Sequence, residues 1–162
     1  MVADELAAGI SGGARIVSSP ARRARQTAAP IARRIPGSRV EIDGRWSEVD
    51  FGIAEGLTFD ELAELAPDLA NRLASGDLDI DWPGGETATS LAARVGSAWR
   101  SLLGQPGTVI VVAHGGPLRI AIGLATGQAA RSVTLPEPGA VVRLFTGPGD
   151  PADDGAMLRF RS

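Results

Sequence analysis

The chain has 162 residues, a formal net charge of −3, one histidine and no cysteine. This is the length of one domain, long enough to bury about two-thirds of its unfolded surface, and we expect a single domain over residues 1–162. The charge gives no general attraction to nucleic acid or to an anionic membrane, and a chain without cysteine forms no disulfide and no thiolate metal site. With one histidine, a zinc site would depend almost wholly on carboxylates, so we expect neither a metal nor another cofactor.

The chain also lacks the sequence signals of membrane insertion and export. No apolar run approaches the ~20 residues that span a bilayer, and the N-terminus has no signal-peptide pattern. The hydrophobic content of 44% and the charged content of 22% are ordinary for a globular protein. We therefore expect a cytoplasmic protein with no nucleic-acid or membrane partner.

The first third of the chain alternates between helix and strand patterns. The expected elements, in chain order, are the last turns of a helix over 3–10, a strand over 14–19, a helix over 21–35 and a strand over 39–43. Ser19 and Pro20 are typical of an N-cap and a first helical position, so we expect them to begin the second helix. Pro30 lies inside that helix and predicts a kink or a break.

The alternation continues after a glycine-spaced loop over 44–57. The expected elements are helices over 58–66, 68–75 and 90–103, a strand over 108–113, a helix over 117–126 and a strand over 140–145. The helix over 58–66 begins with the spacing of a capping box. The strand over 108–113 is apolar at every position except the first, as expected of a central parallel strand that is covered on both faces. Strands that alternate with helices predict an α/β layered fold with a mainly parallel sheet, followed by a loose tail or edge strand over 147–162.

The single histidine, His114, directly follows the apolar strand over 108–113. Gly115 and Gly116 come next, and glycine lets a backbone approach a ligand closely. The helix that follows directs its free N–H groups and the positive end of its dipole at the same place. A lone histidine is often a packed core residue, but this context favours a ligand site.

A second strand end carries arginine. The strand over 14–19 leads into a helix whose first turns hold Arg22, Arg23 and Arg25. Ligands of such sheets bind beyond the carboxyl ends of the strands, and the planar fork of arginine suits phosphate. A histidine, a glycine turn and a nearby arginine together predict an anion site, most naturally for phosphate.

Four stretches of the chain have the character of motifs. They are "SSPARRARQTA" (18–28), "SEVDFGIAEGLTFDEL" (47–62), "WPGGET" (82–87) and "VVAHGGPLR" (111–119). In this order and spacing they resemble the motifs of the histidine phosphatase superfamily, the phosphoglycerate mutase-like proteins. One such motif would be a weak signal, whereas four in the family's order are specific. The resemblance extends to about residue 145 and implies a three-layer α/β/α fold with a mainly parallel central sheet.

The resemblance also implies a set of site residues. The family transfers a phosphoryl group to a histidine nitrogen and then to water. Arg23 would hold two phosphoryl oxygens, while His114 and the N–H of Gly115 would donate to the others. Glu48 would protonate the leaving alkoxide and later take a proton from the attacking water.

Four further residues near these motifs are expected to have structural roles or are undecided. Glu55 is expected to brace its loop rather than react. Glu86 is expected to form hydrogen bonds within its loop or at the start of the following helix. Trp46 is expected in the core, while for Trp82 the core and the mouth of the pocket both stay open.

The chain departs from the family at its first residues. The family begins with a strand that ends in an R-H-G motif, whose histidine is the nucleophile, and this sequence contains no such motif. We expect an N-terminally truncated version of a working phosphatase that begins inside the helix after that strand. The strand over 108–113 would then lack a neighbour on one side, which favours association between copies of the chain.

Two alternatives come from other classes of function. A catalytically inactive pseudophosphatase would keep the anion site and bind a phosphorylated ligand or a protein partner; an R-H-G codon run upstream of Met1 would argue against it. An esterase is disfavoured, because Ser11 of "GISGG" follows a helix and precedes a strand, the reverse of a nucleophile elbow.

Within the family, the short segment between Glu55 and Glu86 favours a phosphatase over a mutase, because it leaves little cover over the site. The partner would be a small phosphorylated metabolite. Small sugar phosphates, phosphoglycolate-like acids, nucleoside monophosphates and α-ribazole phosphate are all compatible with the sequence.

Overall fold

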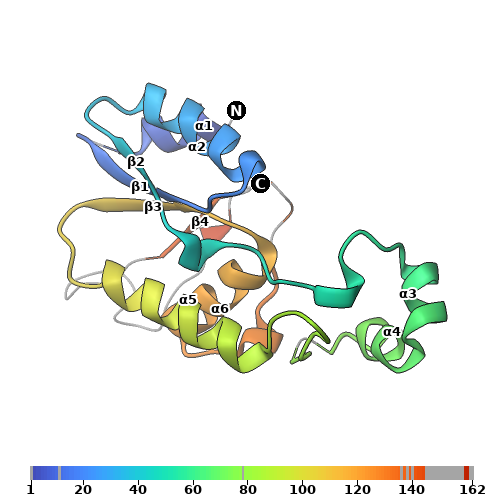
Figure 1. The fold of residues 1–162 in the computed structure, drawn as a ribbon. Helices are drawn as coiled ribbons and strands as arrows, with labels where there is room; N and C mark the ends of the chain where they lie inside the picture. The colour runs from blue at the N-terminus through green and yellow to red at the C-terminus, as the bar shows by residue number, and fades with distance from the viewer. Residues whose placement is uncertain are drawn as a thin grey trace. The chain divides into compact units, whose positions relative to one another are not determined.

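A three-stranded parallel sheet organises the larger of the two units into which the chain divides (Figure 1). The computed structural model describes residues 2–10, 12–77, 79–135, 137, 139, 141–144 and 159–160. The larger unit comprises Met1–Glu48 and Val95–Ser162, and the smaller unit comprises Val49–Arg94. Each unit has an apolar cluster of its own.

The strands of the sheet are β1 (Ala14–Ser18), β2 (Arg39–Ile42) and β3 (Thr108–Val112), in the order β2-β1-β3. Both pairs are parallel, and Ser18 is in register with Ile42 on one side and with Val112 on the other. The three strands therefore end at one edge of the sheet. This confirms the predicted parallel arrangement and places the two strand ends that carry chemistry next to each other.

The burial of β3 differs from the prediction. Among the described residues β3 pairs with β1 alone, Thr108 is exposed, and the four residues after it are only partly buried. Within the described sheet β3 is an edge strand, which agrees with the expectation that it lacks a neighbour on one side and contradicts that of a central strand, and its residues are only partly covered.

Helices lie on both sides of the sheet, as Figure 1 shows. On one side are α1 (Val2–Ala8) and α2 (Arg22–Arg34), whose apolar side chains form a cluster with the sheet that includes Leu6, Ile16 and Ile31. On the other side are α6 (Gly115–Thr126) and the part of α5 (Ala88–Leu102) that belongs to this unit. The predicted three-layer α/β/α fold is thus confirmed.

In α2 the predicted break at Pro30 and the predicted N-cap at Ser19 were both wrong. The helix runs through Pro30 without a break, and the carbonyl that would have bonded the missing N–H belongs to Gln26, an exposed residue whose backbone water can solvate. The N-cap is Ala21, which forms no side-chain cap hydrogen bond, rather than Ser19. The Ser19 hydroxyl accepts a weak bond from the Ala21 N–H at 3.3 Å, and it has a second partner described below.

The smaller unit contains α3 (Phe59–Leu65) and α4 (Pro67–Ala74), which pack around Leu62 and Leu69. Thr58 and Glu61 form both bonds of the predicted capping box, so this prediction is confirmed. The described residues also form three short 3-10 turns, η2 (Gly52–Ala54) in this unit and η1 (Gly44–Trp46) and η3 (Ala130–Ser132) in the larger one.

The last described strands are β4 (Val142–Arg143) and β5 (Arg159–Phe160). They pair antiparallel with each other in a separate two-stranded sheet, which corrects the expectation of a closing strand over 140–145 in the parallel sheet. The loose loop expected over 147–155 lies outside the described residues. No described helix is both long enough and apolar enough to cross a membrane.

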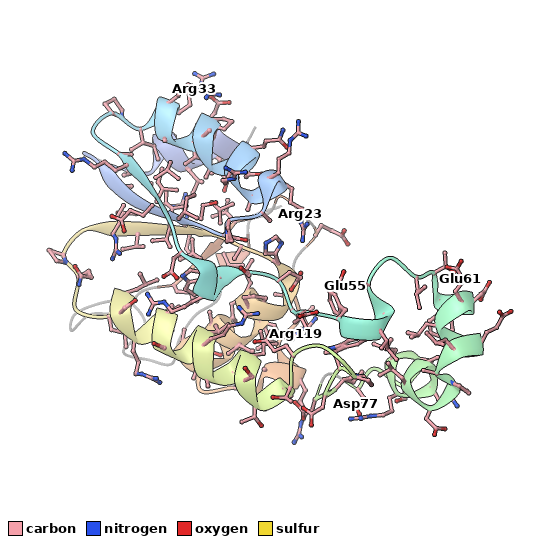
Figure 2. The ribbon with its side chains drawn as sticks, viewed as in Figure 1. Arg23, Arg33, Glu55, Glu61, Asp77 and Arg119 are labelled. Atoms are coloured by element: carbon pink, nitrogen blue, oxygen red, sulfur yellow. The ribbon has the colours of Figure 1, made fainter. Side chains whose placement is uncertain are left out.

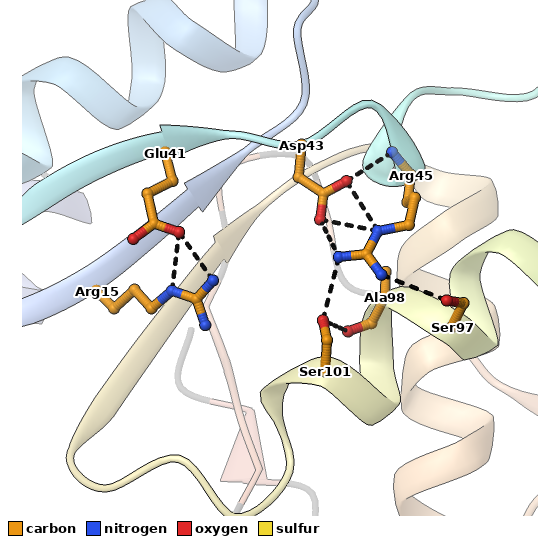
Figure 3. A network of polar contacts seen from close by, with 7 residues as sticks. All are labelled: Arg15, Glu41, Asp43, Arg45, Ser97, Ala98 and Ser101. Atoms are coloured by element: carbon orange, nitrogen blue, oxygen red, sulfur yellow. Dashed lines mark hydrogen bonds and ion pairs between the residues drawn. The ribbon is translucent and has the colours of Figure 1, made fainter.

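A polar network holds the loop that leads to Glu48 (Figure 3). Asp43 caps η1, and Arg45 donates to the Asp43 carboxylate with an Nη2–Oδ2 distance of 2.7 Å. Arg45 also donates to the hydroxyls of Ser97 and Ser101 on α5 at 3.3 and 3.2 Å. The network therefore connects the end of β2 to α5 within the larger unit.

This network predicts a pH-dependent stability. The guanidinium of Arg45 holds the pKa of Asp43 below its ordinary value of 3.8. The pair therefore stabilises the fold fully above the unfolded pKa and loses its contribution as the pH falls through the lower folded pKa. We expect Arg45→Ala to reduce the free energy of unfolding by about 1 kcal/mol at neutral pH and by less in acid.

Urea unfolding, followed by tryptophan fluorescence at neutral pH and near pH 3, measures this difference. Arg39→Ala is the matched control, because Arg39 is exposed on β2 and no ion pair is seen for it in the described part of the chain. An equal loss of stability at both pH values in Arg45→Ala would contradict the prediction.

Candidate active site

The site lies where β1 and β3 end. His114 follows β3, has an extended backbone with φ −126° and ψ 171°, and is the N-cap residue of α6. The helix begins at Gly115, two residues earlier than predicted, so the two glycines form its first turn instead of a loop. The Ser19 N–H donates to the Val112 carbonyl at 2.9 Å and joins the two strand ends.

His114 is held from both sides of its ring. Arg23 in the first turn of α2 (Figure 2) places Nη2 3.0 Å from Nδ1 of His114. The hydroxyl of Ser19 lies 2.7 Å from Nε2. His114 is 7% exposed and Ser19 is fully buried, whereas Arg23 is exposed. The structure therefore brings the predicted arginine and histidine into direct contact.

Glu48 lies at the start of α6, the helix that His114 caps. Its Oε1 accepts a hydrogen bond from the Gly116 N–H at 3.3 Å. This carboxylate therefore contacts Gly116. The neighbouring Gly115, whose N–H was predicted to donate to phosphate, is exposed. A carboxylate at a helix N-terminus is in a favourable electrostatic position, and the same position suits a phosphate.

Sequence reasoning missed Ser19 as a site residue, because its position before a helix indicated a cap. Ser19 could have been found from its position at the end of β1, because the register of the two strands places it beside the residue that precedes His114 on β3. Arg22 and Arg25, which share the first turns of α2 with Arg23, are exposed. Among the described residues, no hydrogen bond or ion pair of either side chain is seen.

Trp46, close to Glu48 in the sequence, is 1% exposed, which confirms its predicted place in the core. Its indole Nε1 is buried without a hydrogen-bond partner. Tight burial of this side chain in η1 holds the segment that leads to Glu48.

Glu55 and Glu86, which were expected to have structural roles, both lie in the smaller unit and form hydrogen bonds or ion pairs there. Glu55 Oε1 accepts from the Phe51 N–H at 3.0 Å, which confirms that it braces its loop. The side chain of Glu86 forms a bidentate ion pair with Arg94, both contacts at 2.7 Å. Its backbone accepts from the Trp82 N–H at 3.1 Å, which confirms the expected loop hydrogen bonding rather than the helix-start alternative. Asp81 takes that role instead by accepting from the Ala88 N–H. Trp82 is partly buried against the apolar cluster of this unit.

The site contains groups that can bind an anion. Arg23 offers guanidinium donors, and the start of α6 offers backbone N–H groups. Among the described residues, no group of three or more histidine, cysteine, aspartate or glutamate side chains is placed to hold a metal ion.

Residues 2–148 match the histidine phosphatase superfamily (branch 1), and the chain belongs to this superfamily. The fold, the paired strand ends and the contact between Arg23 and His114 agree with the motifs that indicated it. The predicted family is thus confirmed.

Two curated relatives and one solved structure illustrate the match. The chain is 41% identical over 116 residues to the "Bifunctional protein Rv2228c" of Mycobacterium tuberculosis (strain ATCC 25618 / H37Rv), covering 70% of this chain and 31% of that protein. It is 33% identical over 102 residues to the "Probable phosphoglycerate mutase GpmB" of Escherichia fergusonii, covering 62% of this chain and 47% of that protein. The chain thus spans less than half the length of either relative.

The solved structure is that of the mycobacterial glucosyl-3-phosphoglycerate phosphatase Rv2419c in complex with VO3. It is similar to this chain with a TM-score of 0.72 and 25% identity, over 99% of this chain and 80% of that one. The described architecture is therefore that of histidine phosphatases.

Proposed function

We propose that the complete natural protein is a phosphomonoesterase of the histidine phosphatase type that acts on a small phosphorylated metabolite, and that this chain supplies its phosphate-binding and acid–base residues. The observation that carries the proposal is the contact between Arg23 and His114 beside the N-terminus of α6, where Glu48 also lies. A guanidinium, a helix N-terminus and a carboxylate supply what phosphoryl transfer needs: positioning, charge neutralisation and a proton carrier.

The proposed reaction has two steps. In the first, a histidine nitrogen attacks phosphorus, the bond from phosphorus to the ester oxygen breaks, and Glu48 gives a proton to the leaving alkoxide. In the second, water attacks the phosphohistidine, Glu48 takes a proton from that water, and the phosphorus–nitrogen bond breaks to release inorganic phosphate. Arg23 binds phosphoryl oxygens in both steps, so it stabilises the charge that they carry.

The nucleophile in this proposal is a histidine outside these 162 residues. His114 is unsuited to the task, because a guanidinium only donates and therefore occupies the lone pair of Nδ1. The ring proton then lies on Nε2, where it is donated to the Ser19 oxygen. Neither nitrogen keeps a lone pair free for an attack on phosphorus, and the one ring N–H is already donated to Ser19, so in this arrangement His114 serves the phosphate site by holding Arg23.

Hydrolysis is favoured over a mutase reaction by the shortness of the segment between Glu55 and Glu86, whose described residues form the two short helices α3 and α4. A longer insertion there would be needed to shield a phosphoryl group from water. The solved relative that acts on glucosyl-3-phosphoglycerate makes phosphorylated sugar derivatives the first substrates to test.

The test is hydrolysis of p-nitrophenyl phosphate and of sugar phosphates by the complete natural protein in the presence of EDTA. We expect turnover that does not depend on divalent ions. Turnover that requires a divalent ion would contradict the proposal. No turnover, with phosphate binding retained, would instead support the non-catalytic pseudophosphatase.

A further inference from the structure

We propose that Ser19 is a positioning residue of the anion site, which acts through His114 on Arg23. In this arrangement the Ser19 hydroxyl holds His114 as the neutral Nε2–H tautomer, and Nδ1 of that ring holds the guanidinium of Arg23. The tautomer is inferred from geometry alone, whereas the consequence for phosphate binding rests on the function proposed above.

The first step is the assignment of the ring proton. Arg23 Nη2 is 3.0 Å from Nδ1, and a guanidinium has no acceptor, so Nδ1 must accept. A neutral imidazole carries one N–H, which therefore lies on Nε2 and is donated to Ser19 Oγ at 2.7 Å. The opposite tautomer would set an N–H of the ring against an N–H of the guanidinium.

The burial of Ser19 and His114 raises the cost of losing the hydrogen bond between them. Ser19 is fully buried and His114 is 7% exposed, so water cannot readily replace a lost partner. A buried donor left without an acceptor costs more than the bond itself contributes. The Ser19 oxygen is held by the short turn after β1, where the Ala21 N–H also donates to it at 3.3 Å.

The third step connects the buried serine to the exposed arginine. Arg23 has a long side chain with several rotatable bonds, and its guanidinium is the part expected to hold phosphate. Nδ1 of His114 gives this guanidinium an acceptor, which orients it before an anion arrives. Preorganised donors bind more tightly because less side-chain freedom is lost on binding.

The chain contains one histidine, so the protonation of this ring can be read without ambiguity. The experiment is ¹⁵N NMR of the histidine ring in the ligand-free chain, together with orthovanadate titration. For the unmodified protein we expect a single tautomer protonated at Nε2. For Ser19→Ala we expect a mixture of tautomers and vanadate affinity lower by about three- to tenfold.

Two variants separate positioning from general stability. Ser19→Thr keeps the hydroxyl and is expected to keep both the tautomer and the affinity. Ser18→Ala is the matched control, since Ser18 is equally buried but its hydroxyl donates to the Ser19 carbonyl. An Nδ1–H tautomer in the unmodified protein, or an unchanged spectrum and affinity in Ser19→Ala, would overturn the proposal.

The ligand-free spectrum needs no turnover, so it stands apart from the phosphatase assay. Absence of hydrolysis with the expected tautomer would remove the proposed function and leave the role of Ser19 intact. Hydrolysis with the wrong tautomer would do the reverse.

Discussion

Replacing Arg23 by alanine is expected to weaken the binding of inorganic phosphate or orthovanadate by about 100-fold or more. Each hydrogen bond to a charged group contributes roughly 1.5–3 kcal/mol, and the guanidinium fork can form two with one phosphate. The change also removes the donor that meets Nδ1 of His114 at 3.0 Å, so the ring loses part of its support. Turnover should fall with binding, because the same charge is present in the ground state and in the transition state.

Isothermal titration of the purified protein with each anion measures the affinity directly. Arg25→Ala is the matched control: it removes one exposed arginine from the same helix end and changes the net charge equally. Arg23→Lys should recover only a small part of the affinity, since an ammonium lacks the planar fork. Equal losses in Arg23→Ala and Arg25→Ala would show that the site depends on overall charge instead of on this contact.

The sequence predicts the positions of Arg23 and His114 well because they follow regular elements. Strand ends in a parallel sheet meet at one edge, and the apolar runs of the sequence predicted both β1 and β3. Once β1 and β3 are adjacent, the arginine and the histidine after them are neighbours. Local pattern and simple topology were therefore sufficient for this half of the site.

Ser19 shows where this kind of reasoning ends. A serine before a helix has a strong local preference for capping, and sequence alone cannot reveal a competing partner that is distant in the chain. In the fold, the Ser19 hydroxyl is hydrogen-bonded to Nε2 of His114, and α2 begins without a side-chain cap. A tertiary contact displaced a local preference.

Pro30 and β3 show the same limit in the fold. The penalty of proline in a helix is offset where the apolar face of that helix packs on a sheet, and Ala28 and Ile31 on either side of Pro30 are buried in this way. The apolar run of β3 predicts that the strand can be buried, but how far it is buried depends on which elements lie beside it.

The role of Glu48 leads to the second large effect. Glu48→Gln should leave phosphate affinity nearly unchanged or slightly higher, because the amide oxygen can still accept from the Gly116 N–H and one negative charge is removed from the site. Turnover of alkyl phosphates should fall by roughly 10²–10⁴-fold, the usual contribution of a positioned general acid. An alkoxide is a poor leaving group that needs the proton, whereas p-nitrophenolate leaves readily without it. In kcat/KM, which reports the first step and not the later attack of water, the loss for p-nitrophenyl phosphate should therefore be much smaller.

Values of kcat/KM for the two ester classes in the complete natural protein, together with phosphate titration, test this pattern. Glu55→Gln is the control, because it makes the same chemical change at a carboxylate that accepts from the Phe51 N–H and braces its loop. If Glu48→Gln slowed both esters equally, proton transfer to the leaving group would not be its function. If it weakened phosphate binding as strongly as Arg23→Ala, its main effect would lie in the shape of the anion site, through the start of α6.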